Sequence, residues 1–290
     1  MHDSPQAPRQ AQRRHSLVRR ATVRVVERLA LMCGGRAWYR KAHLSPPGLR
    51  VRRELITHAE LPAGLEGLLI VQLSDLHAGP FMRRGDLARA VEMVERLEPD
   101  LVVITGDMIT HHVDEARGIA EDIARLRAPM GVYAIFGNHD YRDRREDEIV
   151  RDWGARGVQF LRDDARRFEV EGGALALVGV EDLEEARVID VRRARASVVP
   201  SDFEVVLCHH PAGALLFAGP RCLAVLSGHT HGTQLDLPLA RRAGPAHPGL
   251  RVHLGATRLI VSRGLGSIGL PLRIGAPTEL VSIELRRGVA

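Results

Sequence analysis

Short apolar runs alternate with amphipathic stretches from about residue 60 onward, and this alternation allows few folds. Three strand-like runs are each followed by a stretch with apolar residues at helical spacing. Because strands joined by helices usually lie parallel in one sheet, this order predicts an α/β protein. The strands are expected at Leu68–Leu73, Leu101–Thr105 and Val132–Phe136, and the helices at Asp86–Leu97, Asp114–Leu126 and Asp143–Ala155.

The second half of the chain has a different character, with further short β-like segments and fewer helices between them. A second sheet is therefore predicted. Its candidate strands are Arg166–Val170, Ala174–Val180, Glu204–Cys208, Cys222–Leu226, Arg251–Leu254, Leu259–Ser262 and Glu279–Leu285.

Charge is divided unevenly along the chain. Residues 1–58 contain 13 Lys and Arg against 3 acidic residues, whereas residues 59–290 contain 28 basic and 33 acidic residues. We therefore expect a basic N-terminal arm over 1–58 and a catalytic domain over 59–290. Within the arm, helical spacing predicts an amphipathic helix with an apolar stripe flanked by arginines. The stripe is Leu17, Ala21, Val25 and Leu29, and the arginines are Arg20, Arg24 and Arg28.

A narrow apolar stripe beside arginines suits a helix that lies on an anionic membrane surface. The longest uncharged stretch of this region, Leu29–Gly35, is far shorter than the roughly 20 residues needed to span a bilayer. One alternative is a helix packed on the body. Another is contact with nucleic acid, but we do not expect it because bases stack on aromatic side chains and the arm has only Trp38 and Tyr39. The odd number of cysteines, three, favours a reducing compartment. The expected location is the cytoplasm, peripherally on the inner membrane face.

Polar residues follow the predicted strands at five places. Since sites in α/β sheets form at the carboxyl ends of strands, their coincidence indicates one functional site, although each piece alone is a weak signal. The pieces are Ser74-Asp75-Leu76-His77, Gly106-Asp107, Gly137-Asn138-His139-Asp140, His209-His210-Pro211 and Gly228-His229-Thr230-His231-Gly232.

These side chains form a mixed oxygen and nitrogen ligand set of Asp, His and one Asn amide. Such a set suits Mn, Fe, Co, Ni or Zn rather than Ca or Mg alone. Seven side chains are too many for one ion but suit two divalent ions that share a bridging carboxylate. Two divalent ions against the carboxylates of Asp75 and Asp107 leave a positive site, and two-metal sites of this kind activate water and clamp a phosphoryl group.

The same motifs, in this order, resemble those of calcineurin-like metallophosphoesterases over about residues 60–290. Further segments are similar to the YkuE/YaeI-like bacterial branch of membrane-associated phosphodiesterases, and that branch also resembles the chlamydial-type UDP-diacylglucosamine hydrolases. These segments are Ser262-Arg263-Gly264-Leu265-Gly266-Ser267 and Gly269-Leu270-Pro271-Leu272-Arg273. The resemblance implies a four-layer αββα sandwich of two mixed β-sheets with a dinuclear site at one edge.

The resemblance also implies a role for each site residue. The first metal is held by Asp75, His77 and His231, and the second by Asn138, His209 and His229. Asp107 bridges the two ions, and a bridging hydroxide attacks phosphorus. His139 is the catalytic residue that stabilises the equatorial oxygens or protonates the leaving group, with Asp75 as the expected partner of its imidazole. His209 is chosen over His210 by the family pattern His-x-Pro, which leaves His210 as a neighbour that faces the substrate.

Two positions depart from the family pattern. Thr110 stands where the family usually has an Asp three residues after the bridging one, and we expect altered order around the site rather than loss of metal. Gly232-Thr233-Gln234 replaces the usual Gly-Gly-Gln, so Thr233 is expected in a substrate-binding loop that differs from the family's.

The sequence thus predicts a metal-dependent phosphoric ester hydrolase of the phosphodiesterase or pyrophosphohydrolase type, acting on a lipid-linked or membrane-proximal substrate. The alternatives are a cytosolic phosphomonoesterase or nuclease-type phosphodiesterase, and a non-catalytic scaffold with the same fold.

Overall fold

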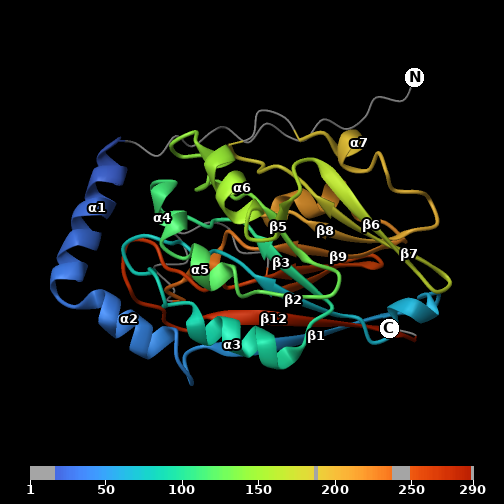
Figure 1. Cartoon of the computed structure of the whole chain (residues 1–290), viewed down its shortest axis with the longest axis horizontal. Coiled ribbons are helices and arrows are strands. Elements are labelled where there is room, and N and C mark those ends of the chain that lie inside the picture. Colours follow the sequence, from blue (N-terminus) through green and yellow to red (C-terminus); the bar gives the residue numbers. More distant parts are fainter. Residues whose placement is uncertain (1–16, 186–188, 237–248, 289–290) are drawn as a thin grey trace.

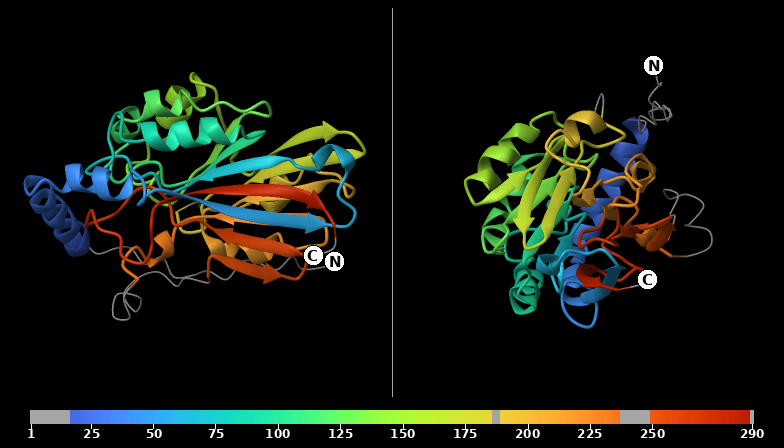
Figure 2. Two further views of the ribbon diagram at one scale, coloured as in Figure 1. Left: turned by 90° about the horizontal axis from the view of Figure 1, so that it is seen from below. Right: turned by 90° about the vertical axis from the view of Figure 1, so that its right-hand side faces the viewer.

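Two six-stranded mixed sheets lie face to face with helices on their outer sides (Figures 1 and 2). The computed structural model describes residues 17–185, 189–236 and 249–288. This arrangement confirms the four-layer αββα sandwich. The first sheet has the order β1-β12-β2-β3-β4-β5 and the second β10-β11-β9-β8-β7-β6.

The strands are β1 (Arg50–His58), β2 (Leu69–Leu73), β3 (Leu101–Thr105), β4 (Val132–Ile135), β5 (Val158–Phe160), β6 (Asp164–Val170), β7 (Gly173–Gly179), β8 (Phe203–Leu207), β9 (Cys222–Ser227), β10 (Arg251–Leu254), β11 (Thr257–Val261) and β12 (Glu279–Arg287). The α-helices are α1 (Leu17–Met32), α2 (Gly35–His43), α3 (Ala88–Leu97), α4 (Asp114–Arg117), α5 (Ala120–Ile123), α6 (Glu146–Gly154) and α7 (Val191–Ala194). Neighbouring strands β2, β3, β4 and β5 are parallel, as are β7, β8, β9 and β11.

The predicted helix over Asp114–Leu126 is interrupted. It forms two short helices, α4 and α5, with Gly118 as the residue that ends the first. Glycine is a poor helix former because it loses more backbone freedom than other residues, which explains the break at this position.

Each central strand serves two hydrophobic cores because successive side chains point to opposite faces of the sheet. In β2, Ile70 packs in the core between the sheets, whereas Val71 packs beneath the outer helices. In β3, Val103 packs in the core between the sheets and Val102 packs beneath the outer helices. All four side chains are fully buried, so these strands are uninterrupted apolar runs in the sequence.

Part of the expected arm belongs to the folded body. Strand β1 pairs with β12 along its whole length, from Arg50 opposite Glu279 to His58 opposite Arg287. In α2, Tyr39 is fully buried and its hydroxyl donates to the carbonyl of Leu265 at 2.7 Å. The boundary expected at residue 58 therefore cuts through the first sheet and must be corrected. Residues 1–16 of the arm lie outside the described residues, as do the side chains of residues 17–20, which include Leu17 and Arg20 of the predicted amphipathic pattern.

The N-terminal helix α1 lies at one end of the sandwich, beside α2 (Figure 1). Its docking depends on Glu27, which is only 3% exposed and accepts a hydrogen bond from His111 at 2.7 Å and one from the backbone N–H of Gly269 at 3.2 Å. Among the described helices, none combines the length and apolar character required to traverse a bilayer.

Replacing Tyr39 with Ala should lower the free energy of unfolding by about 3–5 kcal/mol, because it leaves a cavity in the core beneath α2. The adjacent Trp38 is 46% exposed, so Trp38→Ala is the matched control and should cost about 1 kcal/mol or less. Urea unfolding of the full chain provides the measurement. Equal costs for the two variants would mean that α2 does not contribute to the cooperative core.

Candidate metal centre

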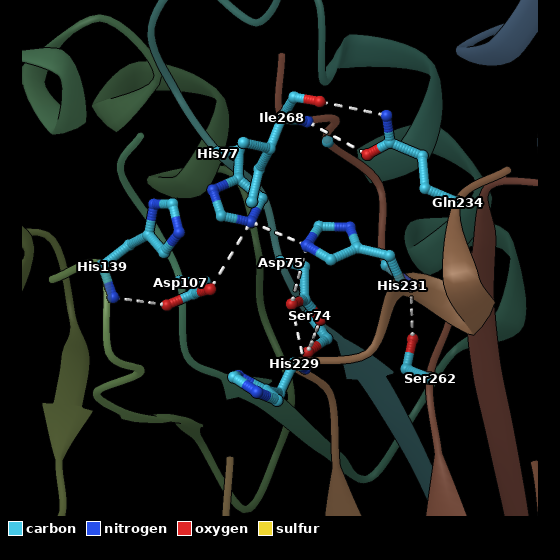
Figure 3. Close-up of polar contacts among 12 residues, drawn as sticks. Ser74, Asp75, His77, Asp107, His139, His229, His231, Gln234, Ser262 and Ile268 are labelled. Atoms are coloured by element: carbon cyan, nitrogen blue, oxygen red, sulfur yellow. Dashed lines mark hydrogen bonds and ion pairs between the residues drawn. The ribbon is translucent and has the colours of Figure 1, made fainter. Parts of the chain in front are cut away.

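The polar segments expected at strand ends meet at one end of the sandwich, where residues from both sheets come together. Figure 3 shows side chains from these segments converging on one point. The first sheet contributes Asp75 and His77 after β2, Asp107 after β3, and Asn138 and His139 after β4; the second contributes His209 after β8, and His229 and His231 after β9. The predicted ligands are thus assembled from five strand ends.

Asp107 lies between the two predicted halves of the site. Its Oδ2 is 3.5 Å from Nε2 of His77 on one side and 3.3 Å from Nε2 of His209 on the other. Its Oδ1 accepts the backbone N–H of His139 at 2.8 Å. One carboxylate oxygen that faces two imidazoles from different sheets is the geometry expected of a bridging ligand.

The first group combines Asp75, His77 and His231 with Asp107. Nε2 of His77 is 3.0 Å from Nε2 of His231, and Nε2 of His231 is 3.5 Å from Oδ1 of Asp75. One ligand atom from each of the four buried residues lies within 4.8 Å of the others. These two ring nitrogens are within hydrogen-bond distance of each other, and a cation bound between them and the two carboxylates would replace that contact.

The second group is formed by Asn138, His209 and His229. Nδ1 of His229 lies 3.1 Å from Oδ1 of Asn138. Nε2 of His209 is buried and has no hydrogen-bond partner among the described residues, although a buried polar atom normally has one. A divalent ion bound here would satisfy this atom, so the residues present fit a metal at the second position as well as at the first.

Backbone carbonyls fix the orientation of several imidazoles. Nδ1 of His77 lies 3.2 Å from the carbonyl of Ile109, and Nδ1 of His209 lies 2.7 Å from the carbonyl of Thr105. A carbonyl accepts a hydrogen and cannot donate one, so Nδ1 carries the proton in both rings. Nε2 of each ring is thereby directed at Asp107, and in the deprotonated ring its lone pair would be available to a metal.

Burial determines the protonation of the ligands in the ion-free chain. It lowers the pKa of His77 to about 4 and that of His229 to about 3, so both rings are neutral at pH 7. Burial also raises the pKa of Asp75 to about 6. At Asp107 burial acts in the same direction, but the surrounding imidazoles of His209, His139 and His77 together outweigh it and hold the pKa of Asp107 well below its usual range.

The backbone at the site is unusual. Asp75, His77, Asp107, His229 and His231 all have positive φ angles, between 45° and 68°. Residues with side chains rarely adopt this left-handed conformation, and clusters of such strain are typical of functional sites. Sharp turns at these residues allow alternate side chains, such as those of Asp75 and His77, to face one centre.

Gly137 allows the closest approach in the site. A Cβ atom at this position would lie 2.4 Å from Oδ1 of Asp107 and 2.7 Å from Nε2 of His209. Any other residue would therefore push apart the carboxylate of Asp107 and the imidazole of His209.

His139 has different partners from those expected. Its Nδ1 donates to the carbonyl of Thr110 at 2.9 Å, and its Nε2 accepts from Nη2 of Arg142 at 2.7 Å. Asp75 instead accepts from the hydroxyl of Ser74 and the backbone N–H of His229. The expected pairing of His139 with Asp75 is corrected accordingly, and Arg142 is a site residue that sequence reasoning missed.

Thr110 itself is ordered by short contacts. Its hydroxyl donates to the carbonyl of His77 at 3.0 Å, and its N–H lies 3.0 Å from Glu115 Oε2. The same carboxylate oxygen accepts the N–H groups of His111 and His112. Glu115 thus supplies a negative charge at the turn where the family usually has an Asp, and this turn holds the carbonyl that orients His139.

The two residues expected to contact substrate lie at the edge of the centre. The ring of His210 is 4.4 Å from that of His229, and its Nδ1 accepts the N–H of Ala212. Thr233 is half-buried, and its hydroxyl donates to the carbonyl of Gly232 at 2.7 Å. Whether they contact substrate stays a prediction.

Glu184 is a second residue that the sequence reasoning missed. Its Oε1 lies 3.8 Å from Nε2 of His210 and 3.9 Å from Nε2 of His229. It follows β7, which ends in the polar segment Glu181-Asp182, so the same strand-end pattern could have identified it. A carboxylate behind a ligating imidazole commonly orients the ring.

The segment Ser262–Ser267 lines the first group from behind. Backbone N–H groups of Leu265 and Gly266 donate to the carbonyls of Ser74 and Asp75, at 3.1 and 2.7 Å. Arg273 is buried and donates to the carbonyl of Arg263 at 2.8 Å, with its Nη2 3.3 Å from Nδ1 of His231. This segment therefore positions Asp75 and His231.

The fold and the mixed set of Asp, His and Asn side chains fit the class of two-metal phosphoesterases. Residues 68–233 match the family of calcineurin-like phosphoesterases, and the chain belongs to this family. It is 34% identical over 243 residues to a transmembrane protein with metallophosphoesterase domain from Danio rerio, covering 79% of this chain and 55% of that protein. The chain thus spans about half the length of that relative.

A bacterial relative matches over almost its whole length. The uncharacterized metallophosphoesterase YkuE of Bacillus subtilis (strain 168) is 28% identical over 269 residues, covering 89% of this chain and 92% of that protein. This match confirms the YkuE-like branch. Among solved structures, a dimetal phosphatase from Danio rerio aligns with 76% of this chain and 94% of its own, with 15% identity and a TM-score of 0.43.

Replacing Asp107 with Asn should abolish hydrolysis and reduce bound metal from about two ions per chain to below one, because it removes the charge shared by both groups. Elemental analysis after incubation with manganese gives the stoichiometry. Asp122→Asn is the matched control, since Asp122 is also buried and accepts a backbone N–H, from Gly85, away from the ligands. Two bound ions and normal turnover in Asp107→Asn would contradict the bridging role.

Proposed function

We propose that the protein hydrolyses a phosphodiester or pyrophosphate at a dinuclear metal centre, on a lipid-linked or membrane-proximal substrate. The observation that carries the proposal is the position of Asp107 Oδ2 between His77 and His209. Ions of Mn, Fe, Zn, Co or Ni suit this mixed ligand set, and when bound they supply an activated water and neutralise charge on the phosphate.

The chain itself supplies His139 and Arg142 beside the centre. Arg142 donates to Nε2 of His139 and, through Nη1, to the carbonyl of Thr110 at 2.8 Å. An arginine is always a donor, so Nε2 of His139 carries no proton in this arrangement. We therefore assign the pair to electrostatic stabilisation of the phosphate oxygens, with the guanidinium supplying the charge.

The exposed face of α1 supports a membrane-proximal role. Val25 and Leu29 of the predicted apolar stripe are 56% and 57% exposed, and Met32 extends the stripe at 83%. Arg24 and Arg28 flank it. Exposed apolar side chains beside arginines fit the surface of an anionic membrane. We propose a peripheral position on the inner face of the cytoplasmic membrane.

A hydrolysis screen in manganese tests the activity and the substrate class together. It compares phosphomonoesters, phosphodiesters, nucleotide-sugar pyrophosphates and phospholipids. Preference for diesters or pyrophosphates is the expected result. Preference for monoesters would favour the cytosolic phosphomonoesterase, and absence of turnover despite two bound ions would favour a scaffold.

His139→Ala should retain both metals but lower kcat by about 10²–10⁴-fold. Because Nε2 carries no proton, the loss should be equal for a nitrophenolate leaving group and for an alkoxide, which needs protonation far more. Steady-state kinetics on two such diesters give the comparison, and metal analysis of the variant is the control. A much greater loss for the alkoxide would assign proton transfer to His139.

Val25→Asp/Leu29→Asp should abolish sedimentation of the protein with vesicles that contain phosphatidylglycerol, because it places charge in the apolar stripe. Binding of the unaltered chain should weaken with salt, which shortens the screening length to about 8–10 Å near physiological strength. Val199→Asp/Leu215→Asp is the matched control, since both residues are exposed and lie far from α1 in sequence. Equal sedimentation of both variants would remove the membrane role of α1.

A further inference from the structure

A cavity of about 540 Å³ lies between α1 and the loops that follow β2 and β3. Its volume is in the range of small-molecule sites. Helix α1 forms one wall, and the two loops form the other. Figure 1 shows α1 beside this end of the sandwich.

The wall from α1 is basic. Arg24 and Arg28 line the cavity and are exposed, and within the described part of the chain neither guanidinium has an acidic partner. Arg83 lines it from the loop after β2, and its guanidinium donates to the carbonyl of Gly79 and to no other group among the described residues. Two acidic residues also line the cavity, and both are already satisfied: Glu27 is paired with His111, and Glu115 accepts the backbone N–H groups of Thr110, His111 and His112. The unpaired arginines therefore give the cavity a positive potential that favours an anion.

The rest of the lining is partly apolar. Leu31 continues the same face of α1 one turn beyond Glu27 and is half-buried, and Met82 is almost fully buried in the opposite loop. Pro80 lies between Gly79 and Met82 on that loop. Arginines above apolar side chains are suited to a ligand that carries an anionic group on a hydrocarbon.

The loops that line the cavity also carry metal ligands. Gly79 lies two residues after His77, and His111 directly follows Thr110, whose carbonyl binds His139. On α1, Val25, Leu29 and Met32 each follow a cavity residue by one position. One position corresponds to a rotation of about 100°, so the exposed apolar stripe borders the arginine wall. The cavity thus lies between the membrane-facing stripe and the metal centre.

We propose that this cavity binds an anionic amphiphile, namely the part of a lipid-linked phosphate ester that carries a second anionic group and the start of its hydrocarbon. Arg24 and Arg28 bind the oxyanion of the ligand, while Leu31 and Met82 contact its hydrocarbon. The inference rests on the proposed function for its biological role, but binding can be measured without turnover.

Isothermal titration of the metal-loaded full chain with decanesulfonate, below its micelle concentration, tests the proposal. A sulfonate has no phosphoester bond to hydrolyse, so binding is separated from catalysis. Arg24→Ala/Arg28→Ala should weaken binding at least tenfold. The control Arg166→Ala/Arg192→Ala, which removes two exposed arginines from β6 and α7, should retain the affinity of the unaltered chain.

Two further probes separate the contribution of the anionic group to binding from that of the hydrocarbon. Methanesulfonate, which has no chain, should bind at least tenfold more weakly, and decyltrimethylammonium, which has the opposite charge, should not bind measurably. Equal affinity in the Arg24/Arg28 and control variants, or equal binding of all three probes, would overturn the proposal. Binding of decanesulfonate by a chain that hydrolyses no phosphate ester would count against the proposed function alone.

Discussion

The carboxylate of Asp107 is the group on which the rest of the site depends. It lies two residues after the buried strand β3, and its two oxygens contact residues that follow β2, β4 and β8. A buried carboxylate is costly unless it is compensated, and here His209 supplies the compensation in the ion-free chain. Two divalent ions would meet the same need more completely. The position of Asp107 between the two groups thus serves folding as well as catalysis, because the buried carboxylate needs positive charge beside it.

Bringing ligands from two sheets to one carboxylate requires a strained backbone. Five ligand residues adopt left-handed conformations that side chains disfavour, at a cost of order 1–3 kcal/mol each. The surrounding loops hold them there by backbone contacts, such as those from Leu265 and Gly266 to the carbonyls of Ser74 and Asp75. Since a strained loop persists only when its surroundings determine it, burial at the sheet ends keeps the ligands in place.

Helix α1 connects this centre to the surface. Glu27 fixes the helix to the body through His111, which lies next to the turn that orients His139. The stripe beside Glu27 is left exposed, with Val25 and Leu29 more than half accessible. Glu27, together with Ala30 and Leu31 that pack against the core, therefore fixes which face of the helix lies on the body and which face is free.

The sequence by itself determined the α/β class and indicated which polar residues gather at the candidate centre, because fully buried parallel strands require uninterrupted apolar runs and sites form where such runs end. The sequence also predicted the apolar stripe of α1, because helical periodicity depends only on residues a few positions apart. Tertiary structure alone decided the place of β1, whose alternating arginines do not resemble a buried strand, and the partners of His139. Glu184 follows the end of β7 and was accessible to the same strand-end reasoning, whereas Arg142 and Thr110 acquire their roles from contacts between the loops after β3 and β4. Such contacts depend on how the two loops pack against each other, and no local pattern in the chain encodes that.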